Sequence, residues 1–271
     1  MRMTPKHASL PMYDFAGVAE ATDLLWSHLK RGPLSEFYDA PDRLTRGMDL
    51  WDLWQRENLF LAQTCGFPFV HKLRGQVGLV GTPDYGVVPE KPGWYYSVIL
   101  CRQDDPRRTL ADFEGAKFAL NETGSQSGCH ALMHTLNTQF GTEKLLGGSL
   151  LTGAHVHSAL AVLEGEADIA AVDIVTWLHV QRDHPEVSGL RVLLQTEPTP
   201  GLPYITANAQ DAAQLGECIS EGIQSLPAQT AKALFLKGVW RSSEADYDII
   251  EARAHAAKAV FESYFPNGLA H

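Results

Sequence analysis

The sequence predicts an α/β protein of two lobes, each built on a mainly parallel β-sheet with flanking helices. Short apolar runs alternate along the chain with amphipathic helical stretches, a pattern typical of parallel strands joined by helices. Residues 168–173 are almost continuously apolar, as expected for a strand covered on both faces. Residues 196–203 are rich in Pro and Thr and follow a strand, which indicates a returning crossover. Together these observations predict one lobe inserted into the other.

The individual elements follow from hydrophobic periodicity and from turn residues. Apolar residues at helical spacing predict helices over 17–29 and 48–65, and Gly- and Ser-containing turns open two more over 124–138 and 153–164. Everything after Asn208 is expected to be helical. The expected strands are residues 8–14, 42–46, 94–101, 117–120, 168–173 and 190–195.

Two crossings, near Tyr96 and near Thr196, divide the chain and form a double-crossover hinge. Lobe 1 is expected to contain residues 1–96 and 197–271, and lobe 2 to be the inserted segment 97–196. The sequence contains no internal repeat or long linker that would favour separate domains in series.

Composition excludes several classes of protein. The 22 Lys and Arg against 32 Asp and Glu give a formal charge of −10, which argues against nucleic-acid binding. No run of about 18 apolar residues is present, so membrane insertion is not expected. Four widely spaced cysteines without a C-x-x-C pair predict reduced thiols, no metal site and no cofactor. The N-terminus lacks the apolar core of a signal peptide, which predicts a cytoplasmic chain.

The most informative motif is NETGSQSG at residues 121–128, between a strand and a helix. Glycines allow a close backbone turn, hydroxyls donate hydrogen bonds, and the helix N-terminus presents free N–H groups with a positive dipole end. These features suit an anion cradle, while an ordinary N-cap explains the same residues equally well. The run is neither an NTPase phosphate loop nor a nucleophile elbow, since no Gly-Lys-Ser/Thr follows and Gln126 occupies the central position.

A second turn, TGAHVHS at residues 152–158, also opens a helix. Two helix N-termini in one lobe can converge on one anion, and His155 would add a hydrogen bond or a titratable charge. The alternative is that His155 and His157 are solvated turn residues. A zinc site is not expected, because positions i and i+2 of a helix do not share a face.

Three further residues lie where strands of the predicted sheets end. Asp173 closes an apolar strand, where it either pairs with a ligand ammonium or caps the next helix. Tyr13 follows the first strand, and Tyr85 lies in the loop after residues 77–80. Both tyrosines either contact a ligand or pack at the rim of the lobe.

Taken as a set, these motifs resemble those of the phosphate, phosphite and phosphonate solute-binding proteins of ABC importers. The resemblance spans roughly residues 8–207, and the order of its motifs is more specific than any one of them. It implies the type 2 periplasmic-binding fold, two α/β lobes that close on a ligand oxyanion. The motifs that carry it are LPMY (10–13), YYSVI (95–99), LADFEG (110–115), GSQSG (124–128), TGAH (152–155) and DIAAVD (168–173).

The resemblance also implies a set of ligand-binding residues. In such relatives the Ser/Thr-rich turn and the histidine at the second helix start hold the phosphonate, and an acid near the next strand can hold an amine. The positions that this implies here are Ser125, Gln126, Ser127, His155 and Asp173, with Tyr13 and Tyr85 from the other lobe. The sequence departs from the family at Gln126, where a hydroxyl is usual, and in lacking a signal peptide or lipoprotein cysteine.

The leading hypothesis is a non-catalytic protein that binds a small phosphonate-like, phosphate-like or carboxylate ligand in the cleft between the lobes. An ABC permease is the partner implied, and the chain is periplasmic if it is the processed form of an exported product. The alternatives are a cytosolic enzyme on a scaffold similar to menaquinone- and thiamine-pathway enzymes, and a cytosolic ligand sensor. No nucleophile, base and orienting acid stand at a recognisable spacing, although His155 and Asp173 form one acid/base pair to consider.

Overall fold

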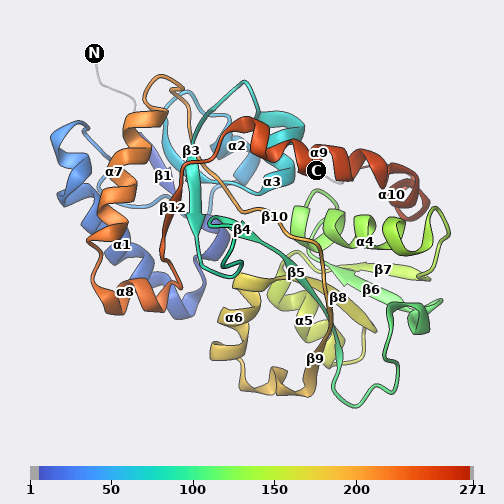
Figure 1. Cartoon of the computed structure of the whole chain (residues 1–271). Helices are drawn as coiled ribbons and strands as arrows, with labels where there is room; N and C mark the ends of the chain where they lie inside the picture. Colours follow the sequence, from blue (N-terminus) through green and yellow to red (C-terminus); the bar gives the residue numbers. More distant parts are fainter. Residues whose placement is uncertain (1–5, 269–271) are drawn as a thin grey trace. The chain divides into compact units, whose positions relative to one another are not determined.

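The computed structural model describes residues 6–268, and it divides into two compact units. The first unit comprises residues up to 94 together with 200–248, and the second comprises 95–199 together with the chain from 249 onward (Figure 1). The backbone therefore passes from one unit to the other three times, at 94/95, 199/200 and 248/249. The first two passages run through β4 (Trp94–Tyr95) and β10 (Thr199–Pro200), which form a two-stranded sheet.

The third passage differs from the division that the sequence pattern predicts, in which residues 197–271 all belong to lobe 1. Residues from 249 onward belong to the second unit. The physical reason is burial: Ala257, Val260 and Phe261 lie in the same apolar core as Leu132 and Leu136 of that unit.

The first unit is built on a five-stranded mixed sheet in the order β1-β2-β11-β3-β12. β1 pairs with β2 in parallel, whereas β11 pairs antiparallel with both β2 and β3, so that β1, β2 and β3 run in the same direction. Their carboxyl ends therefore lie at one edge of the sheet. The strands are β1 (His7–Ser9), β2 (Leu59–Gln63), β3 (Gly78–Asp84), β11 (Tyr204–Thr206) and β12 (Gly238–Trp240).

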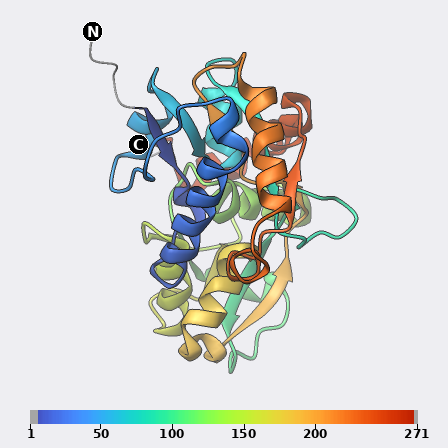
Figure 2. The same cartoon turned by 90° about the vertical axis from the view of Figure 1, so that its left-hand side faces the viewer.

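Two long helices of the first unit, α1 and α7, lie side by side (Figure 2). Their buried residues recur every three or four positions, as Leu25 and Leu29 do on α1 and Leu215 and Ile219 on α7. Gly222 allows the close approach, because a Cβ there would overlap Leu29. The helices are α1 (Ala19–Arg31), α2 (Leu50–Trp54), α3 (Gly66–Pro68), α7 (Ala212–Gln224) and α8 (Ala228–Ala233), with shorter turns η1 (Pro11–Tyr13), η2 (Ala16–Val18), η3 (Pro33–Glu36), η4 (Phe69–Leu73) and η8 (Glu244–Tyr247).

The second unit has a five-stranded mixed sheet in the order β7-β6-β8-β5-β9. β6 is parallel to β7 and β8, while β5 is antiparallel to β8 and β9. The carboxyl ends of β6, β7, β8 and β9 therefore share one edge with the start of β5. The strands are β5 (Ser97–Arg102), β6 (Lys117–Leu120), β7 (Gly148–Leu151), β8 (Ile169–Asp173) and β9 (Leu190–Gln195).

Helices follow three of these strands directly, which places their N-termini at the shared edge. The wide turn η6 continues into α4 after β6, α5 follows β7, and α6 follows β8. The helices are η6 (Gln126–His130), α4 (Ala131–Phe140), α5 (His155–Leu163), α6 (Ile174–Asp183), α9 (Asp248–Ala256) and α10 (Lys258–Tyr264), with turns η5 (Leu110–Phe113) and η7 (Pro185–Gly189).

The predicted α/β fold class, with mixed sheets and flanking helices, is confirmed, but several elements differ. Residues 42–46 form no strand, and the helix expected over 48–65 is only α2, followed by strand β2. All five residues of β2 are buried, since the strand lies between β1 and β11, and this environment overrides the helical spacing of its leucines. The segment after Asn208 is not wholly helical, because β12 adds an edge strand to the first sheet.

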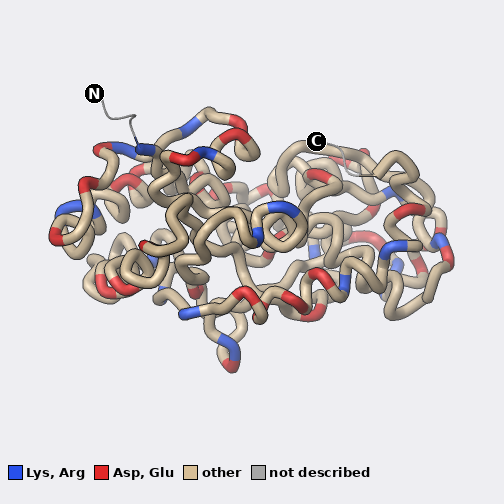
Figure 3. The backbone as a smooth tube through the Cα atoms, turned by 90° about the horizontal axis from the view of Figure 1, so that it is seen from above, with Lys and Arg blue, Asp and Glu red and all other residues tan. Residues whose placement is uncertain are grey.

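The described residues carry no membrane-spanning signature, since none of their helices is both long enough and apolar enough to cross a bilayer. Lys and Arg are interspersed with Asp and Glu along the backbone (Figure 3). The four cysteines are buried thiols.

Candidate functional site

The sequence-predicted residues of the second unit gather at the shared carboxyl edge of its sheet. Ser125, Gln126 and Ser127 follow β6, His155 follows β7, and Asp173 ends β8. Crevices outside the carboxyl ends of parallel strands are where open α/β sheets bind ligands. The topology therefore brings the 125–127 turn, His155 and Asp173 to one edge, although these three positions are widely separated in the sequence.

Ser125 is the N-cap of η6. Its backbone is extended (φ −80°, ψ 129°) and its Oγ accepts a hydrogen bond from Gly128 N–H at 3.0 Å. Its carbonyl oxygen accepts from both Cys129 N–H (3.2 Å) and His130 N–H (3.0 Å), which widens the first turn. The cap that the sequence left as an alternative to the anion cradle is thus present, and the Ser125 hydroxyl hydrogen remains available for donation.

Gly128 makes the turn compact. A Cβ at this position would overlap Asn121 Oδ1 and approach His155 Cε1 to 3.1 Å. Glycine therefore lets Asn121 from the end of β6 and His155 from α5 close on the same turn. This contact fixes the spacing between the two helix starts.

Ser127 is held from two sides. Its Oγ lies 2.8 Å from His155 Nε2, and its carbonyl oxygen accepts a hydrogen bond from Ser97 Oγ at 2.9 Å. Ser97 opens β5, and its N–H donates to Thr196 Oγ1 at 2.9 Å. A chain of hydrogen bonds therefore connects the beginning of β5 and the residue after β9 to the turn that carries Ser127.

Burial lowers the pKa of His155 to about 4, and an interaction with the Ala171 backbone opposes the shift in part. The imidazole is therefore neutral at physiological pH, and in the tautomer with its hydrogen on Nδ1 the Nε2 atom accepts the hydroxyl hydrogen of Ser127. A base this weak is poorly matched to removing a serine proton near pH 7, so the Ser127–His155 pair is not suited to nucleophilic catalysis.

The three helix starts at this edge differ in capping. Ser125 caps η6, and Asp173 Oδ1 caps α6 by accepting from Thr176 N–H at 2.9 Å. Ala154, the N-cap of α5, provides no side-chain cap. The N–H groups at the start of α5 therefore retain their capacity to bind an anion.

Asp173 is almost fully buried, with 1% of its surface exposed, and the structure shows the helix-capping alternative for it. Its assignment to a ligand ammonium stays a prediction. Gln126 lies in the first turn of η6 and is also buried.

In the first unit, Tyr13 and Tyr85 lie at the carboxyl edge of that unit's own sheet. Their rings meet edge to face with centroids 5.0 Å apart. Gln63, the last residue of β2, donates from Nε2 to Tyr85 Oη (3.4 Å) and to the Leu202 carbonyl (3.2 Å). Both tyrosines thus belong to one polar and aromatic cluster.

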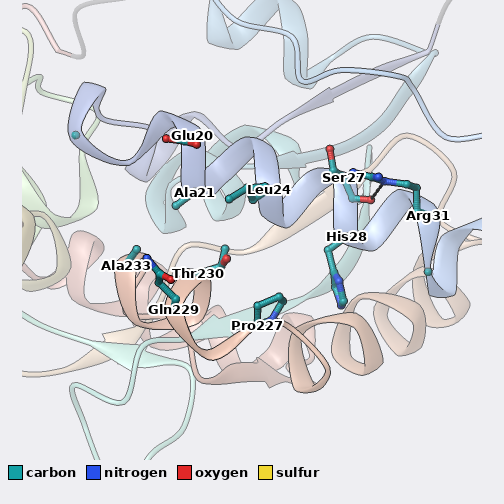
Figure 4. Close-up of a pocket in the computed structure, with 12 residues that line it drawn as sticks. Glu20, Ala21, Leu24, Ser27, His28, Arg31, Pro227, Gln229, Thr230 and Ala233 are labelled. Atoms are coloured by element: carbon teal, nitrogen blue, oxygen red, sulfur yellow. Dashed lines mark hydrogen bonds between the residues drawn. The ribbon is translucent and has the colours of Figure 1, made fainter.

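Two hollows in the first unit differ in their relation to this cluster. A cavity of about 30 Å³ lies between Tyr13, Gln63 and Tyr85 and has room for about one water molecule. A much larger groove of about 850 Å³ lies between α1 and α8, lined by residues such as Leu24, His28 and Thr230 (Figure 4). The groove is bordered by helix faces and not by strand ends, so it does not contain the predicted residues.

Three residues of these clusters were not predicted from the sequence: Gln63, Ser97 and Asn121. Gln63 and Asn121 are polar residues at or just after the end of an apolar strand, the same signal that identified Asp173. Ser97 is a buried hydroxyl at the start of a strand, a position that the sequence pattern alone does not distinguish from ordinary strand residues.

Solved structures with similar folds include bacterial binding proteins. PhnD1 from Prochlorococcus marinus, solved with methylphosphonate, aligns with a TM-score of 0.72 and 14% identity over 94% of this chain and 100% of its own. A binding component of a phosphonate ABC transporter from Pseudomonas aeruginosa aligns with a TM-score of 0.69 and 14% identity, over 94% of this chain and 87% of its own. The aliphatic sulphonate binding protein SsuA from Escherichia coli aligns with a TM-score of 0.60 and 16% identity, over 96% of this chain and 88% of its own. No curated protein matches the sequence.

The fold is thus that of ABC-transporter substrate-binding proteins. Residues 62–247 match the family described as ABC transporter, phosphonate, periplasmic substrate-binding protein, and the chain belongs to this family. It is a ligand-binding protein of the phosphonate solute-binding class, as the sequence motifs predict.

Proposed function

We propose that this protein binds a small phosphonate or phosphate at the edge of the second unit's sheet, through Ser125, Ser127, His155 and the start of α5. The observation that supports this most directly is the combination of an uncapped α5 N-terminus with two hydroxyls on the neighbouring turn. Backbone N–H groups, the helix dipole and the Ser125 hydroxyl hold the oxyanion, so that no lysine or arginine is required.

The tyrosine cluster of the first unit is the second part of the proposal. Tyr13 and Tyr85 offer an aromatic surface and two phenolic hydroxyls, beside the amide of Gln63. These groups suit the organic substituent or the oxygens of a phosphonate. Their role is separable from that of Ser127, because they belong to a different unit.

Isothermal titration calorimetry with methylphosphonate, other phosphonates, inorganic phosphate and small carboxylates tests the function. We expect a phosphonate or phosphate to give the tightest binding. Replacing Ser127 by Ala should weaken binding by about 1–2 kcal/mol, or about 5- to 30-fold, because one hydrogen bond to a charged ligand is lost. Unchanged affinity would remove Ser127 from the site, and no binding by the whole panel would refute the proposal.

A matched histidine pair separates site effects from general ones. His155→Ala should weaken binding of the same ligand, because His155 orients Ser127. His157→Ala, two residues along the same helix, should leave it unchanged, because that side chain is exposed and its Nδ1 lies 3.2 Å from the Thr152 carbonyl oxygen. Equal losses in both variants would indicate damage to α5 instead of loss of a ligand contact.

We propose further that the bound solute is delivered to an ABC permease outside the cytoplasmic membrane, as the family description implies. Fractionation of cells that express the native gene tests the location. Recovery in the cytoplasmic fraction would favour an intracellular binding role.

A further inference from the structure

The arrangement of hydrogen-bond donors and acceptors around Ser127 indicates which protonation state of the ligand fits the site. This inference rests on the proposed function. His155 Nε2 lies 2.8 Å from Ser127 Oγ, and it accepts the hydroxyl hydrogen in the neutral tautomer that carries the ring hydrogen on Nδ1. Burial keeps it neutral by holding its pKa near 4. Ser127 Oγ then presents lone pairs, and not a hydrogen, to anything that contacts it from the other side.

A second acceptor lies against the same turn. Asn121 Oδ1 is buried next to Gly128 and has no hydrogen-bond partner among the described residues. A ligand whose oxygens are all hydrogen-bond acceptors offers a hydrogen to neither atom, whereas a ligand with one P–OH can donate to Ser127 Oγ. A buried acceptor left without a donor weakens binding substantially.

The charges around the turn point in the same direction. The segments that open at this edge, 121–130, 152–158 and 173–177, contain no Lys or Arg. These segments contain two carboxylates. Glu122 lies in the loop before Ser125, and Asp173 lies at the end of β8. The other titratable side chains of these segments are Cys129, His130, His155 and His157. These segments therefore offer a ligand backbone N–H groups and hydroxyls but no Lys or Arg side chain, and Arg253, near the end of β9, is paired with Glu197.

We infer that the second unit selects a singly charged oxyanion that carries an acidic proton, a hydrogen phosphonate or dihydrogen phosphate, over a fully deprotonated dianion or a sulfonate. The ligand's P–OH donates to Ser127 Oγ, and the Ser127 hydroxyl donates to His155 Nε2. No proton is transferred: each stays on its own oxygen. A sulfonate has the same shape and charge but lacks the hydrogen, so it leaves the acceptor unpaired.

Calorimetric titration with methylphosphonate and with methanesulfonate, at pH values from 5.5 to 9, tests the inference on the full chain. We expect methylphosphonate affinity to fall about tenfold per pH unit above the ligand's second pKa, since only the proton-bearing form binds. Methanesulfonate should bind at least about tenfold more weakly at pH 6 and show no such decline. Equal affinity for the two ligands, or methylphosphonate binding that strengthens as pH rises, would overturn the inference.

The Ser127→Ala variant and an NMR measurement locate the proton. Ser127→Ala should reduce the preference for methylphosphonate over methanesulfonate. Ser149→Ala, on the exposed part of β7, should leave this preference unchanged. In ¹⁵N-histidine-labelled protein saturated with methylphosphonate, the His155 ring should keep the chemical shifts of a neutral imidazole. An imidazolium signal would place the proton on His155 and refute the inference. Failure of every phosphonate and phosphate to bind would instead refute the proposed function itself.

Discussion

Gly128 shows how one residue without a side chain sets the geometry of the candidate site. Asn121 and His155 come from different elements and both approach the space that a Cβ would fill. Neither Ser127 nor His155 would keep its position if the two helix starts moved apart. The requirement is therefore steric and does not depend on backbone conformation, because Gly128 lacks a positive φ.

The first prediction concerns this glycine. Gly128→Ala should weaken phosphonate binding more than tenfold and lower the melting temperature, because overpacking displaces Asn121 or His155. Calorimetry and thermal unfolding measure the two effects. Gly124→Ala, in the same turn, has open space around its Cβ and should bind normally. The double variant Asn121→Ala, Gly128→Ala should recover stability, and a failure to do so would locate the clash elsewhere.

A second prediction concerns Ser97, whose Oγ donates a hydrogen bond to the carbonyl oxygen of Ser127. Ser97→Ala should weaken phosphonate binding by a few-fold, since the turn loses one of the bonds that position it. Ser97→Thr retains the hydroxyl and should restore most of the affinity. If the Ala and Thr variants bind equally well, Ser97 does not position the turn.

The C-terminal helices α9 and α10 join the second unit through its core. The Phe261 ring stacks on His130 of η6, with centroids 5.3 Å apart and an interplanar angle of 12°. Arg253 of α9 donates to the carbonyl oxygens of Glu197 and Pro198, just before the chain passes to β10. The C-terminal segment thus supports both the helix that carries the candidate site and one of the passages between units.

The next prediction removes the Phe261 ring and with it the contact to His130. Phe261→Ala should destabilise the second unit by about 3–5 kcal/mol, the usual cost of removing a buried phenyl ring. Urea unfolding measures the loss. Phe37→Ala is the matched control, because that ring is 57% exposed and should change stability by no more than about 0.5 kcal/mol. Equal effects in the two variants would contradict the packing role of α10.

For the whole molecule, buried histidines link stability to pH. Burial lowers the pKa of His155 and of His179 to about 4, and the nearby Arg182 contributes to the shift at His179. The unfolded chain has an imidazole pKa of about 6.5. Both groups therefore favour the folded state above pH 6.5, and this contribution is lost progressively as the pH falls from about 6.5 to 4, because the unfolded state takes up protons first.

Thermal unfolding between pH 7.5 and 4.5 measures this linkage. The melting temperature should fall over the range, and His179→Gln should flatten the fall, because one of the two buried imidazoles is gone. His157→Gln, at an exposed histidine, should reproduce the wild-type slope. A His179→Gln profile parallel to the wild type would show that other groups control the acid sensitivity.

Part of the candidate site was predictable, because the types and positions of its residues indicate anion binding. A Gly/Ser turn after an apolar strand, a histidine at a helix start and an acid at a strand end are each visible in the sequence. The contacts of Ser97 and Asn121 with the turn are not visible in the sequence, because they depend on partners that lie elsewhere in the chain. The helical spacing of the leucines around β2 was misleading for the same reason, since burial between two strands outweighed local preference.

The sequence by itself determined the fold class, the motifs that place the chain in the phosphonate solute-binding family, and the candidate ligand residues of both units. These depend on local patterns: strand runs, turn residues and helix starts. Only the tertiary structure decided that residues from 249 onward belong to the second unit, that Asp173 caps α6, and that Ser127 is hydrogen-bonded to His155. The physical reason is that burial and hydrogen-bond partnership are properties of residue pairs distant in the sequence, and they exist only once the sheet has brought its strand ends to a common edge.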